Sequence, residues 1–427
     1  MTRSQLAIII AASLIVLFFI LIFTGIIPGL KPKTVPVPPP SVTQLNMWGF
    51  KADAAGWQKL IASYKQSHPN INISYMAVDE SNYETNLIDN LAAGTGPDIF
   101  LLQNSWIPKF RNKISPASGN AITIAQVNNL FPPIVGNDFV SSGKIWGLPV
   151  SIDTLALVYN RDIFDSKQLV TPPATWNDVK NLVPRIRELN SGAISRPAIA
   201  LGGSKKSIAD ATDIFSVMMF QLKNQIIDLT LHKATIANST GVQALDLYTQ
   251  FSNPRSSVYT WDDSMNSINS FIDGKTAMIL AYKREVNEIN LKNPVLNLLI
   301  APLPQFDISN PVNIGTYWGL VAASQGRNQN IAWDFINYAA TNSEVQKNYV
   351  NVSGLPPALR ELIPDFATDP SIKVFASQIL TAKSAPYIGY PPVVDALNIM
   401  IESTLINHSA FETNLKAAED KINIIIQ

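Results

Sequence analysis

Aromatic and amide side chains are the residues of this chain whose types suggest a chemical role. The 427 residues include eight Trp and twelve Tyr. A flat aromatic ring covers the apolar C–H face of a sugar, while amides and carboxylates hydrogen-bond its hydroxyl groups. Because a given Trp packs in a core more often than it binds a ligand, its place at a loop or strand end matters. This set of side chains favours a cleft for an uncharged polyol.

Patterns typical of catalysis and of metal binding are missing from the sequence. The absence of cysteine excludes disulfides, thiolate metal sites and a lipid-modified cysteine anchor. The three histidines lie too far apart for an HExxH-type pair. Gly274-Lys275-Thr276 lacks the earlier glycine of a phosphate-binding loop, because Asn269 stands in its place. We therefore expect no enzyme activity, no metal and no cofactor.

The composition narrows the classes of protein. Hydrophobic residues make up 47% of the chain and charged residues 15%, so a large core can form. The 32 Lys and Arg residues balance 32 Asp and Glu residues. A basic surface for the phosphate backbone is therefore not expected, and a nucleic-acid partner is excluded.

The N-terminus resembles a membrane anchor. Residues 6–23 contain one polar residue, Ser13, and are long enough to span a bilayer. No small-residue cleavage site follows, so we expect residues 1–29 to remain as an uncleaved anchor. The next residues, 30–43, are rich in proline and are expected to form an extended linker.

Strand and helix patterns alternate after the linker. Strand-like alternation at 44–49 and 71–75, helical periodicity at 52–66 and 83–93, and a buried strand at 98–102 give a β-α-β-α-β order. This order predicts a mainly parallel sheet between helices, with ligands beyond the carboxyl ends of the strands. The side chains expected at those ends are Trp48, Gln103, Asn104 and Trp106.

The remainder of the chain predicts a second block. Residues 162–271 are mostly helical in pattern, with a helix start at 175–179, and strand patterns return at 276–280, 295–300 and 319–322. Three connections between the two blocks would make a discontinuous two-domain α/β fold.

Several motifs in one order resemble a known family. The chain is similar to extracellular solute-binding proteins of ABC importers, of the maltose-binding-protein-like type. The motifs that carry this resemblance are Gly94-Thr95-Gly96-Pro97-Asp98-Ile99, the segments 143–149, 157–164 and 172–176, the Phe271–Met278 signature, and the segments 301–304, 330–336 and 354–357.

The resemblance implies the type II periplasmic-binding-protein fold, with two lobes and interdomain crossovers after one transmembrane helix. By this alignment, residues 44–155 and 281–315 form lobe 1, and residues 156–280 and 316–427 form lobe 2. A monomer is expected, anchored in the cell membrane with its soluble domain outside the cytoplasm. Lys31 and Lys33 after the span weakly favour the opposite orientation, but long domains translocate largely regardless of flanking charge.

The resemblance also suggests which side chains contact the solute. Asp153 matches a carboxylate at the first crossing that binds sugar hydroxyls, or it caps the turn before Thr154. Trp48 either stacks on the solute or packs against the next helix. The other candidates are Tyr317 and Trp318 near a crossing, Tyr282 in place of a usual aromatic residue, and Trp261, Tyr387 and Tyr390 in the second lobe.

The implied role is capture of a sugar or oligosaccharide and its delivery to the permease subunits of an ABC importer. A ligand-presenting subunit of a membrane sensor would use the same cleft. A membrane-anchored carbohydrate-active enzyme is the third alternative, and it requires two opposed carboxylates in the cleft.

Overall fold

The computed structural model describes residues 2–24, 26, 42–118, 121–228, 230–408 and 410–427. Two compact units result, Met1–Thr43 and Gln44–Gln427. The first contains helix α1 (Arg3–Phe23), whose mean hydropathy is 3.3. Its length and composition suit a membrane span, but a signal sequence meets the same criteria. Residues 30–41 of the predicted linker lie outside the described residues, and its last residue, Thr43, already belongs to strand β1 (Thr43–Phe50).

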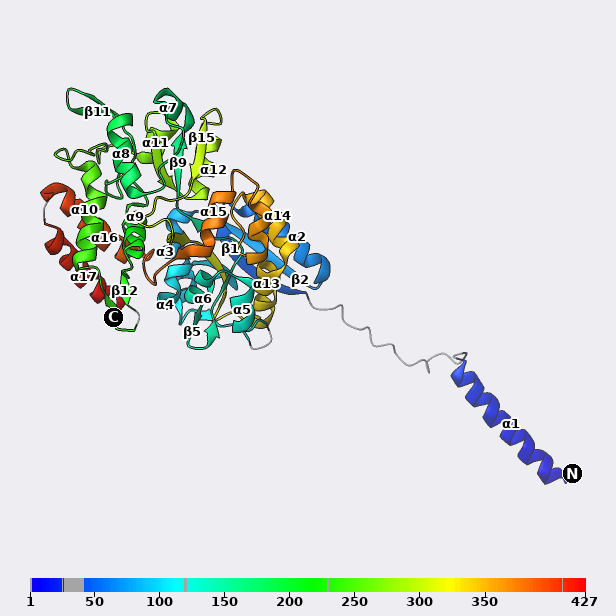
Figure 1. Cartoon of the computed structure of the whole chain (residues 1–427). Coiled ribbons are helices and arrows are strands. Elements are labelled where there is room, and N and C mark those ends of the chain that lie inside the picture. The colour runs from blue at the N-terminus through cyan, green and yellow to red at the C-terminus, as the bar shows by residue number, and fades with distance from the viewer. Residues whose placement is uncertain (1, 25, 27–41, 119–120, 229, 409) are drawn as a thin grey trace. The chain divides into compact units, whose positions relative to one another are not determined.

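Residues 44–427 contain two separate hydrophobic cores, which define two lobes (Figure 1). The core of lobe 1 is built from residues 45–152 and 317–372 together with Ala376 and Ile379, and the core of lobe 2 from residues 155–314, Val374, Phe375 and residues 385–422. The chain therefore crosses between the lobes three times, and the predicted two-lobe α/β fold is confirmed.

The division of the chain between the lobes differs from the prediction after residue 280. The segment 281–315 belongs to lobe 2, because its strand β15 (Leu298–Ala301) pairs with β9 (Ala156–Asn160) of that lobe. The segment 317–372 belongs to lobe 1, because β17 (Trp318–Ala323) pairs with β3 (Ile99–Gln103). Only the last segment, from about residue 374, returns to lobe 2.

Lobe 1 is a mixed sheet covered by helices, with strand order β2-β1-β3-β17-β4 and β7 beside β17. Strands β1 and β3 are parallel as predicted, but β17 is antiparallel to β3, because it enters lobe 1 at the edge where β3 ends. The elements of lobe 1 not yet bounded are α2 (Ala54–Ser67), β2 (Ile71–Val78), α3 (Tyr83–Ala93), α4 (Ile107–Phe110), β4 (Ile114–Ser115), α5 (Ile124–Leu130), α6 (Pro133–Phe139), β5 (Val140–Ser141), β6 (Lys144–Ile145), β7 (Leu148–Pro149), α13 (Gln329–Thr341) and α14 (Ser343–Ser353).

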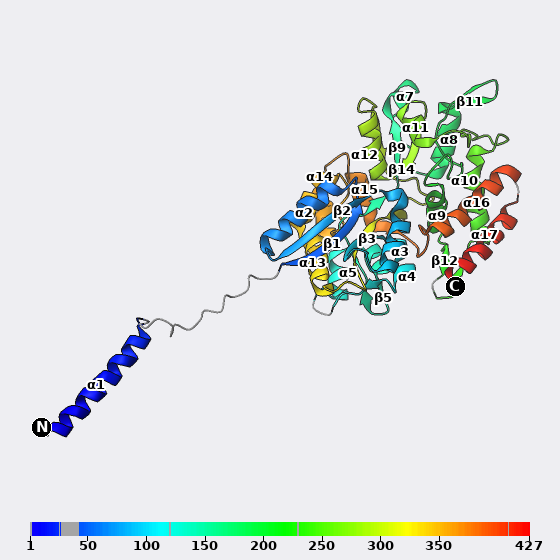
Figure 2. The ribbon, with the colours of Figure 1, turned by 180° about the vertical axis from the view of Figure 1, so that it is seen from behind.

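Lobe 2 combines a small antiparallel sheet, in the order β14-β9-β15, with a layer of long helices (Figure 2). Helices α9, α10, α16 and α17 pack together on one side of it. Its elements are α7 (Arg161–Ser166), α8 (Trp176–Ile186), β10 (Glu188–Asn190), β11 (Ala193–Arg196), α9 (Ala211–Gln221), β12 (Ile227–Asp228), β13 (Lys233–Ala234), α10 (Ser239–Thr249), α11 (Ser267–Ile272), β14 (Met278–Ala281), α12 (Lys283–Lys292), α16 (Pro391–Asn407) and α17 (Phe411–Ile426).

Local sequence accounts for helix α8. Thr175 is its N-cap: the Thr175 hydroxyl accepts from the backbone N–H of Asp178 at 3.0 Å, and the Asp178 carboxylate accepts from the N–H of Thr175 at 3.0 Å. This reciprocal capping satisfies two N–H groups that a helix start otherwise leaves unpaired. The predicted helix start is confirmed.

The hinge between the lobes is a three-stranded sheet with a short helix. Strand β16 (Asn313–Thr316) lies between β8 (Asp153–Thr154) and β18 (Ala382–Lys383). Helix α15 (Lys373–Gln378) carries the third crossing and contributes side chains to both cores. The hinge therefore holds β8 and β16 side by side where two of the crossings occur.

Candidate functional site

A cavity of about 250 Å³ lies between the two lobes next to the hinge. Lobe 1 contributes mainly aromatic and aliphatic side chains, whereas lobe 2 contributes three carboxyl groups, a tyrosine and an arginine. The lining residues are Asp53, Trp57, Glu80, Leu101, Gln103, Val150, Ser151, Tyr317, Trp318, Tyr349 and Leu355 from lobe 1, Asp210, Asp213, Tyr282, Arg284 and Glu285 from lobe 2, and Asp153 and Thr316 from the hinge.

Trp318 is fixed by its position in the sheet and by neighbouring rings. It begins β17 opposite Gln103, at the cavity edge of the lobe 1 sheet. Its ring makes edge contacts with Phe50 at a centroid distance of 4.7 Å and with Trp106 at 5.3 Å. Trp318 is only partly buried, so it gives the cavity a rigidly held aromatic surface.

Asp153 joins the hinge to helix α12. One of its carboxylate oxygens accepts from the backbone N–H groups of Thr154 and Lys283, both at 2.9 Å, and the other accepts from the N–H of Arg284 at 3.0 Å. Burial raises the pKa of this carboxyl to about 6, although these hydrogen bonds oppose the shift. The capping alternative therefore holds, and the cap extends to the start of α12 while Asp153 also lines the cavity.

Tyr282 precedes α12 and is buried against α9. Its hydroxyl donates to the Asp213 carboxylate at 2.7 Å, and its backbone N–H donates to the Glu285 carboxylate at 2.9 Å. Burial raises the pKa of Tyr282, and the neighbouring carboxylates raise it further. The tyrosine is therefore a neutral donor that fixes Asp213 at the cavity wall.

Two buried polar atoms of the cavity lining have no hydrogen-bond partner among the described residues. They are the indole Nε1 of Trp57 and the side-chain Oε1 of Gln103. Trp57 is 3% exposed and packs against Tyr349, while the Gln103 amide nitrogen donates to Thr316. Both atoms are buried, with almost no surface accessible even to water, so they belong to the packed base of the cavity lining rather than to its open surface.

Three carboxyl groups of lobe 2 meet at the cavity. Asp210 and Asp213 lie at the start of α9, and Glu285 lies in the first turn of α12. The carboxyls of Asp210 and Glu285 are hydrogen-bonded to each other. Burial raises the pKa of all three carboxyls, and the negative charges of Glu285 and Asp213 raise that of Asp210 further. A hydrogen bond between two carboxyls requires a proton on one of them, and the raised pKa of Asp210 favours the protonated form of that residue.

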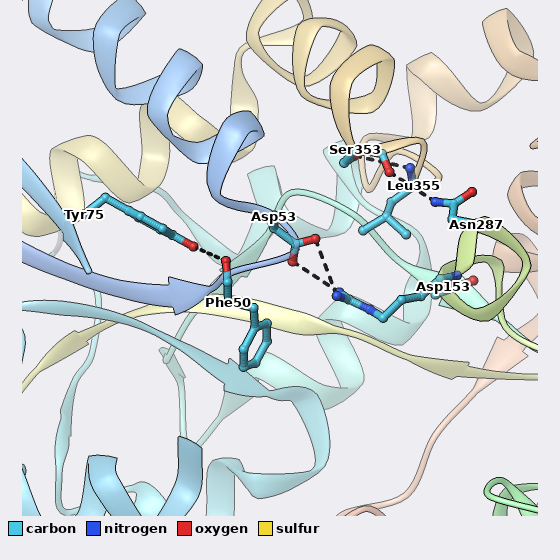
Figure 3. A network of polar contacts seen from close by, with 8 residues as sticks. Phe50, Asp53, Tyr75, Asp153, Asn287, Ser353 and Leu355 are labelled. Atoms are coloured by element: carbon cyan, nitrogen blue, oxygen red, sulfur yellow. Dashed lines mark hydrogen bonds and ion pairs between the residues drawn. The ribbon is translucent and has the colours of Figure 1, made fainter. Parts of the chain in front are cut away.

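An ion pair connects the lobes beside the cavity (Figure 3). The Arg284 guanidinium of α12 lies 3.3 Å from the Asp53 carboxylate, at the start of α2. Asp53 is 7% exposed. Next to this pair, the side-chain amide of Asn287 donates to the Ser353 carbonyl at 3.2 Å. These contacts join lobe 2 to lobe 1 at one side of the cavity.

A second group of contacts joins the lobes through the segment before α16. The indole N–H of Trp106 donates to the Gly389 carbonyl at 2.8 Å, and the backbone N–H of Tyr387 donates to the Ser105 carbonyl at 2.7 Å. Tyr390 packs against both cores. The lobes therefore touch through two sets of contacts, which describes a closed arrangement.

The structure places five of the predicted site residues at the cavity: Gln103, Asp153, Tyr282, Tyr317 and Trp318. The other six lie outside its lining and have other contacts. Trp48 is in the core of lobe 1, and Trp261 is buried in lobe 2, where its indole donates to Ser207. Asn104 donates to Asp138, and Trp106, Tyr387 and Tyr390 belong to the contacts between the lobes.

Sequence reasoning missed most of the charged lining. Asp210 and Asp213 stand at the start of a helix, where acidic residues are common for reasons of helix stability alone. Trp57 follows the apolar period of α2, which predicts only core packing. The single available signal was Arg284 next to Tyr282, which marks a cation at the start of α12.

A larger hollow, of about 700 Å³, lies elsewhere between the lobes, beside α6, β12 and residues 383–386. Two lysines, Lys223 and Lys383, are among its lining residues. Its list of lining residues contains neither a tryptophan nor a tyrosine, and none of the unpaired buried atoms. The smaller cavity is therefore the better candidate for a solute site.

Two lobes joined by three crossings, with a polar and aromatic cavity between them, define a two-lobed solute-binding protein. The family model of the bacterial extracellular solute-binding proteins matches residues 50–346, and the chain belongs to this family. The resemblance found in the motifs is thereby confirmed.

Relatives and solved structures agree with this membership. The chain is similar to a maltotriose-binding protein of Pyrococcus abyssi, with 21% identity covering 77% of this chain and 70% of the relative. The cyclic α-maltosyl-1,6-maltose binding protein of Arthrobacter globiformis superposes with a TM-score of 0.76 and 20% identity, covering 90% of this chain and 99% of that one. The sugar-binding protein MalE of Xanthomonas citri has the same TM-score at 19% identity, covering 90% and 97%. These relatives are binding proteins, as the expectation of a non-enzymatic role requires.

Proposed function

We propose that this chain captures a small carbohydrate-like solute in the cavity between its lobes and delivers it to an ABC permease. The observation that carries the proposal is the combination, in one cavity between the lobes, of the partly buried Trp318 ring with the carboxyl groups of Asp213 and Glu285. A ring face and single hydrogen-bonding groups are what a polyol requires. The names of the relatives, which bind maltotriose, maltose-type sugars and other sugars, support the same class of ligand.

The size of the cavity favours a small solute. Its volume of about 250 Å³ lies just below the usual range for ligand pockets, roughly 300–1,000 Å³. In this closed arrangement one or two sugar rings fit better than a long oligosaccharide. A longer chain would require wider separation of the lobes.

Binding would act by closing the two lobes. A ligand that contacts Trp318 of lobe 1 and the carboxylates of lobe 2 has more contacts in the closed form than in the open form. The population then moves toward closure by the difference in affinity between the two forms. A permease that recognises the closed form would accept only the loaded protein.

Helix α1 would keep the protein at the membrane. A tether raises the local concentration of the binding unit near a transporter without any added contact. The experiment is an alkaline wash of membranes followed by N-terminal sequencing of the retained protein. Retention with an intact N-terminus supports an anchor, whereas a mature protein that begins after residue 23 shows that α1 is a cleaved signal.

The experiment for the solute is a thermal-shift and calorimetric screen of the full chain in a detergent without a sugar headgroup. Mono- and disaccharides, polyols, peptides and phosphorylated solutes are compared. A ligand present at 100 times its Kd adds about 2.7 kcal/mol of stability. Binding of peptides or phosphorylated solutes in preference to every sugar and polyol would contradict the proposal.

The carboxylates do not support the enzyme alternative. Glycosidases place their two carboxyl groups about 5 to 9.5 Å apart on either side of the bond that they cleave. Asp210 and Glu285 are instead in direct hydrogen-bond contact, which leaves no space for a glycosidic bond between them. Their arrangement suits binding rather than cleavage.

A further inference from the structure

Acidic side chains outnumber basic ones in the cavity lining. Six carboxyl side chains line it, those of Asp53, Glu80, Asp153, Asp210, Asp213 and Glu285, against one guanidinium, that of Arg284. Arg284 already pairs with Asp53. Among the described residues, Asp210, Asp213 and Glu285 form no ion pair with any Lys, Arg or His side chain. The negative charge of lobe 2 at this site is therefore not balanced by the protein's own cations.

Backbone N–H groups balance one of these charges but not the others. Asp153 accepts three of them, at the hinge and at the start of α12. Glu285 accepts one, and Asp213 accepts the neutral hydroxyl of Tyr282. A helix N-terminus supplies roughly half a positive charge, so the starts of α9 and α12 do not offset Asp210, Asp213 and Glu285 together.

A single carboxylate suffices to accept hydrogen bonds from sugar hydroxyls. Asp210 and Glu285 are in hydrogen-bond contact, and the negative charge of Asp213 acts on Asp210. A proton or another positive charge relieves this repulsion, whereas neutral hydroxyl groups do not. On the lobe 1 side of the same cavity lies the ring of Trp318. A ligand that suits both walls therefore presents a ring face to lobe 1 and a cation to lobe 2.

We propose that the solute is an aminated polyol of one or two rings, such as an amino sugar, whose ammonium group lies between Asp210, Asp213 and Glu285. The inference rests on the proposed function and specifies its ligand. It replaces the uncharged guest expected from the sequence, because the sequence did not show that these carboxylates share one cavity.

Binding of the ammonium group would displace the proton that Asp210 and Glu285 share. The raised pKa of both carboxyls favours that proton in the free protein. A cation lowers both pKa values, so the proton passes to the buffer on binding, and affinity rises with pH until the pair is ionised. The titratable or charged groups that face the pair are Asp213 of α9, Asp153 of β8, Arg284 and Glu288 of α12, and the tyrosines Tyr248 and Tyr282.

The test is isothermal titration calorimetry on the full chain in the same sugar-free detergent. The probes are glucosamine and its β-1,4-linked disaccharide, each matched with its N-acetylated form, which has the same ring but no charge. We expect the amines to bind at least tenfold more tightly than the N-acetyl forms at pH 6, where the sugar amine is almost fully protonated and takes up no proton on binding. Titrations in two buffers of different ionisation enthalpy should show proton release with the amines only.

Variants assign the effect to the carboxyl pair. Asp210→Asn and Glu285→Gln keep the shape of the side chains. Each should lower the ratio of the affinity for the amine to that for the N-acetyl form at least tenfold, and each should abolish the proton release. The control is Asp246→Asn, the same change at an exposed position of α10, which should retain both. Circular dichroism and thermal melting verify that each variant is folded.

The outcomes separate the two proposals. Neutral sugars that bind as tightly as the amines, without proton release, overturn the ammonium site but leave carbohydrate capture intact. An amine preference that persists in both Asp210→Asn and Glu285→Gln also overturns it. Binding of neither series, when a solute of another class binds, overturns the proposed function as well.

Discussion

The two walls of the cavity differ in chemistry. Lobe 1 presents rings and aliphatic groups, with Trp57, Leu101 and Trp318 at the cavity, whereas lobe 2 presents Asp210, Asp213 and Glu285. The lobe 1 wall rests on a sheet edge, and the lobe 2 wall on two helix starts. Most of the rings come from lobe 1 and most of the carboxyl groups from lobe 2, so a solute gains its full affinity only when both lobes contact it.

The largest expected effect comes from breaking the contact between the walls. Arg284→Met leaves the buried Asp53 carboxylate without its partner, which costs the closed form about 3 kcal/mol. We expect the lobes to open, with a larger radius of gyration in X-ray scattering and a lower affinity. Lys292→Met on the same helix removes an exposed lysine and should change neither value. An unchanged radius of gyration for Arg284→Met would show that the ion pair does not hold the lobes together.

Removal of the ring from the lobe 1 wall has the next largest effect. A ring face that covers about 100 Å² of solute contributes about 2.5 kcal/mol, so Trp318→Ala should weaken binding roughly 70-fold. Trp318→Phe keeps a ring and should recover most of the affinity. If calorimetry finds the alanine variant as tight as the wild type, Trp318 serves only the core.

A smaller effect concerns the charge of the lobe 2 wall. The folded-state pKa values of Asp210 and Glu285 lie above their unfolded values, so the folded form binds protons more tightly. The free protein should therefore lose stability as pH rises from about 4 through these raised pKa values. Asp210→Asn should stabilise the free protein by at least about 1 kcal/mol at pH 7.5 and flatten this dependence.

Thermal melting from pH 4 to 8 measures this dependence. Asp153 has a pKa of about 6, so it adds a further loss of stability between about pH 4 and 6. The wild type and Asp210→Asn should both show this loss. An Asp210→Asn variant that is less stable than the wild type at pH 7.5 would show that other groups of the protein already offset the negative charge of Asp210 and Glu285.

The smallest effect is expected from a change that lowers the folding stability of lobe 2 without altering the cavity. Thr175→Ala removes the N-cap of α8 and should cost about 1 kcal/mol of stability. Because Thr175 does not line the cavity, solute affinity should not change. A loss of affinity would indicate that α8 positions the lobe 2 wall.

Local patterns predicted the elements well and the pairing of distant ones poorly. The helix start at Thr175 and the strands at 98–102 and 319–322 are encoded by capping and by apolar runs. The lobe of residues 281–315 depends on β15 pairing with β9, about 140 residues away along the chain, which no local pattern records. The motifs fixed the family, but not the position of the later crossings.

The candidate site was predictable only in part, and for the same reason. Gln103 was expected at a strand end and Trp318 near a crossing, and the sheet places them opposite each other. Trp48 has a similar position in the sequence, yet it lies in the core of lobe 1. The acidic group was not predicted, because Asp210 and Glu285 come from different helices whose packing the sequence does not display.

Asp153 couples the hinge to the ion pair that joins the two lobes. It belongs to β8, the hinge strand, and its carboxylate accepts hydrogen bonds from the first turn of α12, which carries both Arg284 and Glu285. Bending at β8 therefore moves Arg284, which pairs with Asp53 of lobe 1, together with Glu285, which lines the cavity. Separation of the Arg284–Asp53 ion pair and exposure of the lobe 2 carboxyl groups should therefore occur in one concerted step.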